Sequence, residues 1–323
     1  MDSSSKTCSN TIVTITDKTY LVVVFLLLLS IKYYRVKANI NVLCVGLDDD
    51  DKHFFTQLGG VRTFDGDPTN RRNPATRKAE AILTAEHDGT DYVTLLDGDG
   101  LVTGDITPYL SPGVGFSSRM KSPSEEEHNF YALYEPGEPH GGIPKCVLDA
   151  WRKDVAEASE PRIQNTVTSG NLTIHASCYD FMRKWHKQMM AVLPLKDPGM
   201  PYHFDNVVYP QMDESVLNSL LAFAHDAPEV IPGKLDIDPD AYVAHLGPAK
   251  PRPWVLLRHE KLKYFNLIVR LVDWAEQEGY AIPPLPWTFK KRNKIAVYTA
   301  SYSHLAYRKA KGYVRDRIYR RTR

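Results

Sequence analysis

The amino-acid sequence predicts an α/β protein: one mixed, mostly parallel sheet flanked by helices, followed by a helical, basic C-terminal tail. Two observations predict this class. Short runs rich in β-branched residues alternate with helix-like segments over the first third of the chain, and the short links between them are typical of parallel strands covered on both faces. Positive charge is then concentrated in residues 290–323, outside the alternating part.

The chain opens with a predicted strand and a predicted helix. Residues 11–16 are rich in β-branched side chains, a polar turn follows, and residues 21–29 are an unbroken run of nine apolar residues. A membrane-spanning helix needs roughly 18–20 such residues. A signal peptide would need a small-residue cleavage site, and none follows the run. We therefore predict a core helix here, with a signal or anchor over residues 21–31 as the alternative.

The remaining elements are predicted from hydrophobic periodicity and from turn residues. Strands are expected at residues 40–46, 61–64, 91–96 and 242–245. Helices are expected at residues 52–58, 74–86, 146–157, 177–192, 213–224 and 261–277. Residues 120–145 are rich in proline and glycine and are expected to be mostly loop. The pattern suggests one domain over residues 1–256 and a helical extension over residues 257–323.

Charge is unevenly distributed, although the formal net charge is only +1. Residues 290–323 carry twelve basic residues and one acidic residue, which leaves a net charge of −10 on the rest of the chain.

Ordinary hydrophobic and charged fractions, 43% and 24%, exclude a disordered or collagen-like protein. The four cysteines lie far apart with no Cys-x-x-Cys pair, which excludes a disulfide scaffold and a zinc ribbon.

The strongest chemical signal is Asp97-Gly98-Asp99, directly after the apolar strand at residues 91–96. Ligands bind at the carboxyl ends of strands in α/β sheets, and a glycine between two carboxylates permits a tight bend. Both carboxylates could then bind one Mg²⁺ or Mn²⁺ ion, which would neutralise a diphosphate. A plain turn is the alternative, because Asp and Gly are common turn residues. An EF-hand is excluded, because Leu101 occupies a ligand position of that loop.

A second signal follows the strand at residues 242–245. His245 could complete the metal ligands, Gly247 lets the backbone approach a phosphate, and Lys250 supplies a positive charge to it. A lone histidine is more often an ordinary surface or core residue. The Lys-Pro-Arg-Pro-Trp run that ends at Trp254 favours a ligand-binding segment instead.

Five separated segments, in this order along the chain, make the sequence resemble glycosyltransferase family 8, which includes the lipooligosaccharide galactosyltransferases and glycogenin. They are the first strand with its turn, Asp97-x-Asp99, and the segments that begin at Thr168, Asp213 and His245. The resemblance covers roughly residues 11–255 and implies a GT-A fold with a single Rossmann-like sheet. Within a catalytic domain over residues 1–256, residues 11–105 would bind the nucleotide sugar and residues 106–256 would complete the acceptor and metal sites.

The resemblance also implies roles for individual residues. The donor, expected to be a UDP-sugar, would contact four of these segments and one lysine on the helix before the metal strand, with Arg77 as the alternative to that lysine. The predicted donor contacts are Ile15, Asp17, Thr19, Tyr20, Lys78, Asp97, Gly98, Thr168, Ser169, Gly170, Gly247 and Lys250. Asp97, Asp99 and His245 would bind Mn²⁺ or Mg²⁺. Asp213 and Glu214 would face the reacting sugar as catalytic residues. The family transfers a hexose to a glycan or lipid-linked acceptor and retains the anomeric configuration.

Three departures from the family pattern bear on these roles. Thr168 stands where the family has asparagine, which alters a sugar contact. Glu214 stands where the family has glutamine, and Ser215 replaces the aspartate that follows. The last segment is one residue shorter before its glycine and two longer before Trp254. Because a nearby carboxylate stabilises an oxocarbenium-like transition state, we expect Glu214 to act on the reacting sugar, with an ordinary helix-surface position as the alternative.

Two other classes of function fit parts of the sequence. An aspartate-nucleophile phosphatase would use Asp97 as the nucleophile and Asp99 as the acid/base. That family normally begins with this strand and needs a later acidic pair, for which residues 236–240 are a poor match. A non-enzymatic nucleic-acid-binding or membrane-binding protein would depend on the basic tail alone. Because the acidic body repels nucleic acid, we expect no nucleic-acid partner.

The basic tail is predicted to form an amphipathic helix. Tyr302, Ala306 and Ala310 follow an i, i+4 spacing, and arginines and lysines surround them. Tyrosines beside a cationic face suit the interface of an anionic bilayer. We therefore expect residues 290–323 to hold a cytoplasmic protein peripherally on a membrane face, where a lipid-linked acceptor would lie, with a solvated helix as the alternative.

Overall fold

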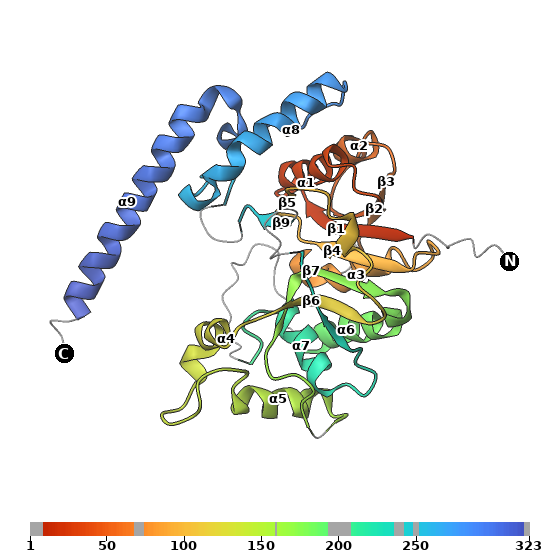
Figure 1. The fold of residues 1–323 in the computed structure, drawn as a ribbon, viewed down its shortest axis with the longest axis vertical. Coiled ribbons are helices and arrows are strands. Elements are labelled where there is room, and N and C mark those ends of the chain that lie inside the picture. The colour runs from red at the N-terminus through yellow and green to blue at the C-terminus, as the bar shows by residue number, and fades with distance from the viewer. Residues whose placement is uncertain are drawn as a thin grey trace.

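The computed structural model describes residues 9–67, 74–158, 160–192, 208–235, 242–247 and 252–319. Its centre is a seven-stranded sheet in the order β3-β2-β1-β4-β7-β6-β8 (Figure 1). The strands of this sheet are β1 (Asn10–Asp17), β2 (Asn39–Val45), β3 (Val61–Asp65), β4 (Tyr92–Leu96), β6 (Phe116–Met120), β7 (Val167–His175) and β8 (Val230–Pro232). A second, small sheet pairs β5 (Gly100–Val102) with β9 (Val243–His245).

The strand directions give a mixed, mostly parallel sheet. β1 pairs in parallel with β2 and with β4, and β2 pairs in parallel with β3. β7 is antiparallel to both β4 and β6, and β6 is parallel to β8. Every strand of the sheet except β7 therefore runs in one direction. The α/β class and the mixed, mostly parallel sheet predicted from the sequence are confirmed.

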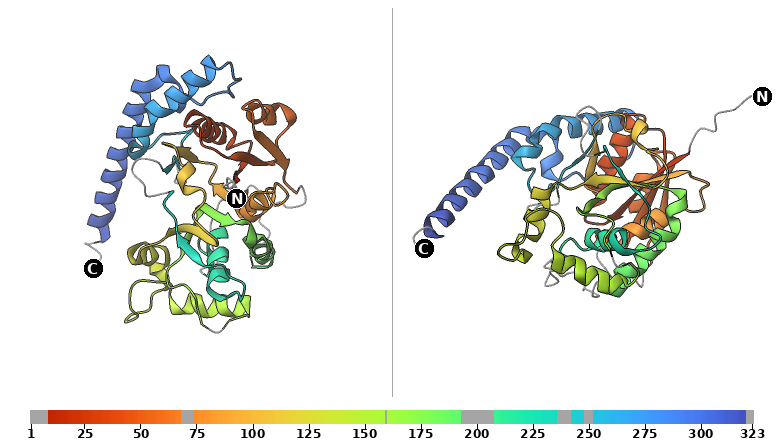
Figure 2. Two further views of the ribbon diagram at one scale, coloured as in Figure 1. Left: turned by 45° about the vertical axis from the view of Figure 1, so that its right-hand side comes forward. Right: turned by 60° about the horizontal axis from the view of Figure 1, so that its bottom comes forward.

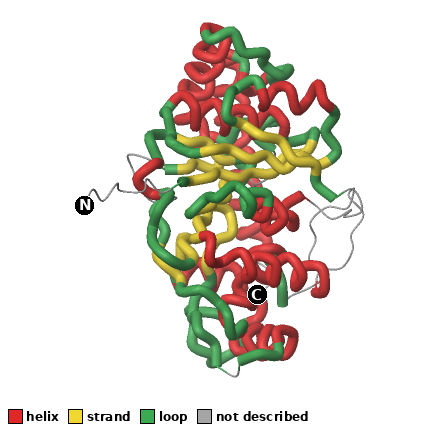
Figure 3. Tube along the Cα trace, turned by 90° about the vertical axis from the view of Figure 1, so that its right-hand side faces the viewer, coloured by secondary structure: helices red, strands yellow, loops and turns green. Residues whose placement is uncertain are grey.

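Helices lie on both faces of the sheet, so that the strands form the middle layer (Figure 3). One face carries α1 (Leu21–Tyr33) and α8 (Phe265–Gln277), which pack against each other. The other helices are α2 (Asp49–Thr56), α3 (Lys78–Leu83), α4 (Pro123–Phe130), α5 (Lys145–Val155), α6 (Tyr179–Val192), α7 (Asp213–Phe223) and α9 (Lys294–Tyr319). Because strand side chains alternate, one core holds Ile12, Val42 and Leu96 with α1, whereas the other holds their neighbours Val13, Leu43 and Leu95 with α3, α6 and α7.

The apolar run near the start of the chain is a core helix. From Val23 to Leu29 every side chain of α1 is fully buried, because the sheet covers one side and α8 another. Asp17 turns the chain into this helix, since its Oδ1 accepts hydrogen bonds from the backbone N–H of Thr19 at 2.9 Å and of Tyr20 at 3.0 Å. Within the described part of the chain, no helix combines the length and the apolar character that crossing a membrane requires.

Several elements differ from the sequence-based expectation. The helix expected at residues 74–86 is a 3₁₀ turn at Pro74–Arg77 followed by the short α3, and the helix expected at residues 261–277 begins with a 3₁₀ segment at His259–Tyr264. Residues 120–145 include α4, where Ser122 and Glu125 form a capping box. β5, β6, β7 and β8 were not predicted. β5, β6 and β8 are short, and the longer β7 has a largely polar sequence, so these strands gain their stability from pairing with distant strands rather than from a readable apolar pattern.

The tail is helical, as the sequence predicts. α9 leaves the body beside α8 and extends away from the sheet (Figures 1 and 2). Only its first part packs on the core: Val297 and Ser301 are buried, and the Ser301 hydroxyl donates a hydrogen bond to the carbonyl oxygen of Leu257. Beyond Ser301 several large side chains are exposed, including Tyr307 and Tyr313 at 63% and 64% exposure.

Candidate active site

The candidate site lies at the carboxyl end of β4, beside the end of β1. The chain bends sharply there: the Asp97 N–H donates to the carbonyl oxygen of Gly170 at 2.8 Å, and the Gly100 N–H donates to that of Asp97 at 2.8 Å. A Cβ on Gly98 would lie 2.7 Å from the carbonyl oxygen of Ile15 and 2.9 Å from Val24 Cγ2. Only glycine lets the bend pack this closely on β1 and α1.

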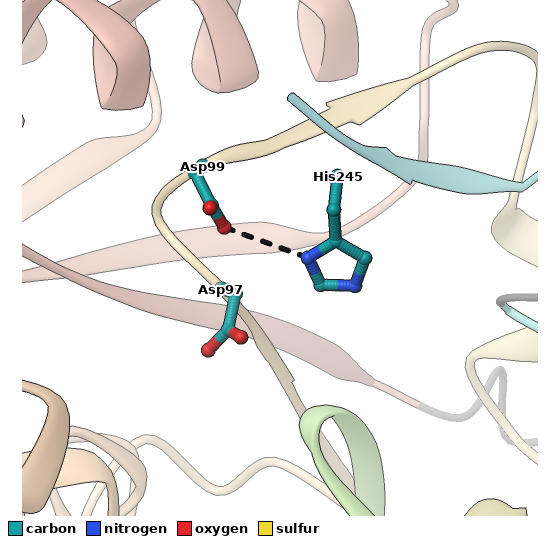
Figure 4. A group of neighbouring side chains, drawn as sticks. All are labelled: Asp97, Asp99 and His245. Carbon is teal, nitrogen blue, oxygen red and sulfur yellow. Dashed lines mark hydrogen bonds and ion pairs between the residues drawn. The ribbon is translucent and has the colours of Figure 1, made fainter. Parts of the chain in front are cut away.

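Pairing between β5 and β9 brings His245, which is far away in the sequence, next to this bend. β5 follows Asp99 directly, and Gly100 is paired with His245. The carboxylates of Asp97 and Asp99 and the imidazole of His245 then offer ligand atoms that all lie within 4.8 Å of one another (Figure 4). A Cβ on Gly170 would lie 2.8 Å from Asp97 Oδ2 and 3.2 Å from His245 Cε1, so the glycine leaves room for two of the three side chains.

The cluster fits a divalent cation. Two carboxylates and one imidazole form a ligand set that suits Mn²⁺, and carboxylates also suit Mg²⁺. Two contacts orient His245: Nδ1 lies 3.5 Å from Asp99 Oδ1, and Nε2 lies 3.1 Å from Asn171 Nδ2. Such outer contacts fix the ring of a metal-binding histidine. The structure therefore brings together the three residues that the sequence predicts as metal ligands.

The pKa of the Asp97 carboxyl group is set by burial and by charged neighbours that act in opposite directions. Burial raises its pKa to about 6; Lys78 opposes this shift, the negative charge of Asp99 adds to it, and His245 opposes it. A partly buried carboxylate that lies beside another carboxylate is stabilised by an added positive charge. The two carboxylates of the cluster are therefore more stable with a bound cation than without one.

Lys78, at the start of α3, is the buried cation of the site. Its Nζ lies 2.9 Å from Asp97 Oδ1 and 3.0 Å from Asp213 Oδ2, and it donates to the Ser169 carbonyl oxygen at 3.2 Å. Burial acts to lower the pKa of Lys78, but Asp213 and Asp97 outweigh this effect and raise it. The lysine is therefore held charged between the metal cluster and the predicted catalytic pair.

The neighbouring arginine does not reach this place. Arg77 is buried and donates to Glu80 through Nε and Nη2, each at 2.7 Å, and to the carbonyl oxygen of Asp67 at 2.9 Å. Of the two basic residues before the metal strand, Lys78 lies in the site and Arg77 stabilises the start of α3.

The predicted catalytic pair lies at the start of α7, next to Lys78. Asp213 Oδ2 accepts a hydrogen bond from the Ser169 hydroxyl at 2.8 Å. Glu214 forms an ion pair with Lys121 through Oε1 and accepts a hydrogen bond from the Ser169 N–H through Oε2 at 3.1 Å. Met212, which precedes the pair, has φ 44°, a strained value for a residue with a side chain. Glu214 is therefore not an ordinary helix-surface residue.

Aromatic side chains flank the other predicted donor contacts, at the end of β1. The rings of Tyr20 and Trp254 meet edge to face with centroids 5.1 Å apart, and the Arg252 guanidinium carbon lies 5.5 Å from the Tyr20 ring centroid. Burial raises the pKa of Tyr20 to about 12, against the charge of Arg252. Ile15 lies beneath Gly98, and Asp17 is used in the turn that leads into α1.

Of the remaining predicted donor contacts, Gly247 lies near the metal cluster, whereas Thr168 bonds to a neighbouring strand. Thr168 bonds to β6, since its carbonyl oxygen accepts a hydrogen bond from the Ser118 hydroxyl at 2.5 Å. Gly247 lies close to the cluster: a Cβ there would be 2.9 Å from Pro253 Cδ and 3.9 Å from Asp99 Oδ2. Lys250 lies outside the described residues.

Three residues of the site were not singled out from the sequence. Asn171 orients His245, and its place opposite Leu96 in the β4–β7 pairing is visible only once the register is known. Arg252 lies beside Tyr20, and its signal was the basic, proline-rich run before Trp254. Lys121 had no sequence signal, because its partner Glu214 is far along the chain.

Comparisons with known proteins return likenesses of structure alone. No protein-family model matches the chain, and no curated protein matches its sequence. The galactosyltransferase LgtC, solved with donor and acceptor sugar analogues, is 14% identical over 86% of this chain and 98% of its own, with a TM-score of 0.49. A structure of an active-site mutant of LgtC is 16% identical over 87% of this chain and 99% of its own, with a TM-score of 0.49.

A third solved structure, the bifunctional glycosyltransferase WbbM, is 15% identical over 68% of this chain and 38% of its own, with a TM-score of 0.43. All three structures are of glycosyltransferases.

Proposed function

We propose that the protein is a metal-dependent glycosyltransferase, which moves a hexose from a UDP-sugar to a glycan or lipid-linked acceptor with retention of configuration. The observation that carries the proposal is the convergence of four motif residues and Lys78 from distant parts of the chain. Asp97, Asp99 and His245 form a cluster that fits a cation, and Lys78 links this cluster to Asp213. Acidic ligands, a buried cation and further carboxylates are the groups that glycosyl transfer from a diphosphate requires.

Asp97, Asp99 and His245 would hold the ion, and Asn171 would keep the imidazole in orientation. A bound Mn²⁺ or Mg²⁺ would supply positive charge to the leaving diphosphate. Lys78 keeps Asp97 in place through its ion pair and is itself only 7% exposed. The proposal therefore assigns the leaving group to the β4–β9 side of the site.

Asp213 and Glu214 would face the positive charge that develops on the sugar ring. Both carboxylates are already held by donors: Asp213 by Lys78 and the Ser169 hydroxyl, Glu214 by Lys121 and the Ser169 N–H. Carboxylates fixed in this way stabilise a developing charge without reorganising during the reaction. We assign them an electrostatic role at the reacting carbon.

The donor nucleotide would lie at the end of β1. Tyr20 and Trp254 offer aromatic surface for the base, and Arg252 beside them offers a planar, charged group for the diphosphate. Gly247 leaves space beside Asp99 for a phosphate oxygen. Lys250 would add a second positive charge.

We also propose that α9 binds an anionic membrane and places the protein on its cytoplasmic face. Its described surface carries exposed tyrosines, Tyr302, Tyr307 and Tyr313, among lysines and arginines, and it stands away from the body (Figure 2). Tyrosine rings and cationic side chains suit the interface of an anionic bilayer. A lipid-linked acceptor would then lie within reach of the site.

A hydrolysis screen tests the transferase assignment. Wild-type protein would be incubated with a panel of nucleotide sugars and Mn²⁺, with release of the nucleotide diphosphate as the readout, and with a generic phosphatase substrate in parallel. We expect turnover of one donor and none of the phosphatase substrate. The Asp99→Asn variant should lose this activity, whereas Asp105→Asn, at an exposed position after β5, should keep it. Phosphatase activity with no donor turnover would contradict the assignment.

A further inference from the structure

A buried ion pair joins β6 to the predicted catalytic pair. Lys121 follows β6 directly, and its backbone N–H donates to the Thr166 carbonyl oxygen at 2.8 Å, which fixes the backbone beside β7. The Lys121 side chain is 9% exposed and pairs with Glu214 Oε1, whose side chain is 14% exposed. An ion pair so shielded from water is strongly coupled, and removing either partner leaves an uncompensated charge.

The opposite side of the Glu214 carboxylate is fixed by β7. Its Oε2 accepts the Ser169 N–H, and the carbonyl oxygen of Glu214 accepts a hydrogen bond from Asn218 Nδ2 at 2.7 Å. Asn218 Oδ1 in turn accepts the Val167 N–H at 2.8 Å. The first turn of α7 is therefore tied to β7 through its backbone, and Lys121 is the only charged donor that the described structure gives to the carboxylate itself.

The same serine connects this carboxylate to the reacting centre. The Ser169 hydroxyl donates to Asp213, and Gly170, the next residue, lies against Asp97. The charged groups that surround Glu214 are thus Lys121 from the end of β6, Glu126 from α4, Asp213 from its own helix and Lys78 beyond it. Without Lys121, Glu214 would lie between two acidic neighbours with no adjacent ammonium group.

We propose that Lys121 is a positioning residue for sugar transfer: it holds the Glu214 carboxylate in place at the reacting sugar. The inference rests on the proposed transferase function. Lys121 would not contact the leaving diphosphate, because its ammonium group is paired with Glu214 and the diphosphate is assigned to the cation cluster and to Arg252. Loss of Lys121 should therefore affect the chemical step and leave donor binding almost unchanged.

The test is a comparison of Lys121→Met with wild type in donor turnover. We expect kcat to fall about 100-fold, the size of effect that a misplacement of about 1 Å at a reacting centre can produce, while KM for the donor stays within about threefold. Lys121→Arg, which keeps a cation, should recover part of kcat. The matched control is Lys145→Met, because Lys145 forms an exposed ion pair with Asp149 on α5 and lies outside the site.

A double-mutant cycle separates positioning from a structural role. If Lys121 acts through Glu214, Lys121→Met should cost nothing further in kcat when Glu214→Gln is already present, as measured with radiolabelled donor. Equal losses in both backgrounds, or wild-type kcat in Lys121→Met, would overturn the inference. If Lys121→Met strongly lowers the melting temperature, the Lys121→Arg variant is the deciding test. A Lys121→Arg protein that is stable but no more active than Lys121→Met would also overturn the inference. Wild-type protein without donor turnover would instead refute the proposed function, and the inference with it.

Discussion

At the scale of single residues, two glycines determine whether the metal cluster can form. Gly98 packs on the carbonyl oxygen of Ile15, and Gly170 packs on Asp97 and His245. Neither glycine has a positive φ, so space and not backbone conformation is the reason for glycine at both positions. The site therefore depends on small residues as much as on its charged ones.

The space at Gly170 leads to a prediction. In Gly170→Ala the added Cβ would lie 2.8 Å from Asp97 Oδ2 and 3.2 Å from His245 Cε1, so these side chains must shift from their positions in the cluster. We expect the affinity for Mn²⁺, measured by isothermal titration calorimetry, to fall about tenfold or more. Gly312→Ala is the matched control, since nothing lies within 4 Å of a Cβ there and the change removes a helix-interior glycine. Unchanged Mn²⁺ affinity in Gly170→Ala would contradict the prediction that the space at Gly170 determines how the cluster binds its ion.

Glu126 leads to a prediction about pH. Burial raises its pKa above 4.5, and among the described residues its buried Oε2 has no hydrogen-bond partner. Because the pKa is higher in the folded state, the carboxyl group contributes most to stability below pH 4.5, and this contribution is lost as the pH rises through the folded-state pKa. Urea unfolding should therefore show the stability of wild type falling relative to Glu126→Gln as the pH is raised from about 4 to about 7. Parallel pH profiles would contradict this.

The sequence predicts the metal ligands better than it predicts their surroundings. Asp97 and Asp99 are adjacent to a readable strand, and His245 ends another. Lys121 and Asn171 owe their positions to strand pairing with residues far away in the sequence, which no local pattern encodes. Residues that orient a metal ligand or a catalytic carboxylate are therefore harder to predict from the sequence than the ligands themselves.

At the scale of elements, segments with continuous apolar runs were predictable, and short or polar ones were not. β1, α1, β2 and β4 contain runs of apolar residues that indicate buried elements. β6, β7 and β8 are short or largely polar and are formed by pairing: β6 lies antiparallel to β7, and β8 lies parallel to β6. The reversed direction of β7 also brings its first residues, Ser169 and Gly170, to the end of β4 where Asp97 lies.

α9 leads to a prediction about membrane binding. Val297 and Ser301 pack on the core, so removal of residues 303–323 should take away most of the basic side chains without exposing that core. We expect the truncated protein to keep its melting temperature within a few degrees and to lose sedimentation with anionic vesicles.

The control for α9 is the full chain with neutral vesicles and at raised salt, where binding should also fail because screening weakens charge attraction. Sedimentation of the truncated protein with anionic vesicles would assign the binding to another surface.

At the scale of the whole molecule, one sheet separates two cores, and the candidate site lies where elements from both meet. Asp97 and Asp99 follow the central β4, His245 comes from the α1 side, and Asp213 comes from the side of α3, α6 and α7. Charge is also divided between two parts of the chain: the body is acidic and the C-terminal tail is basic. Catalysis is assigned to the body and membrane docking to the tail. Net charge alone conceals this division.

The central claim is that Asp97, Asp99 and His245 hold a cation that nucleotide-sugar cleavage requires. The most direct test measures release of UDP from the preferred UDP-sugar after chelation and then during titration with Mn²⁺, for wild type, Asp99→Asn, His245→Ala and Asp105→Asn. The account predicts no turnover after chelation, recovery with Mn²⁺ in wild type and Asp105→Asn, and recovery only at about 10-fold to 100-fold higher Mn²⁺, or none, in the two cluster variants. Turnover that persists after chelation, or that responds to Mn²⁺ equally in all four proteins, would contradict it.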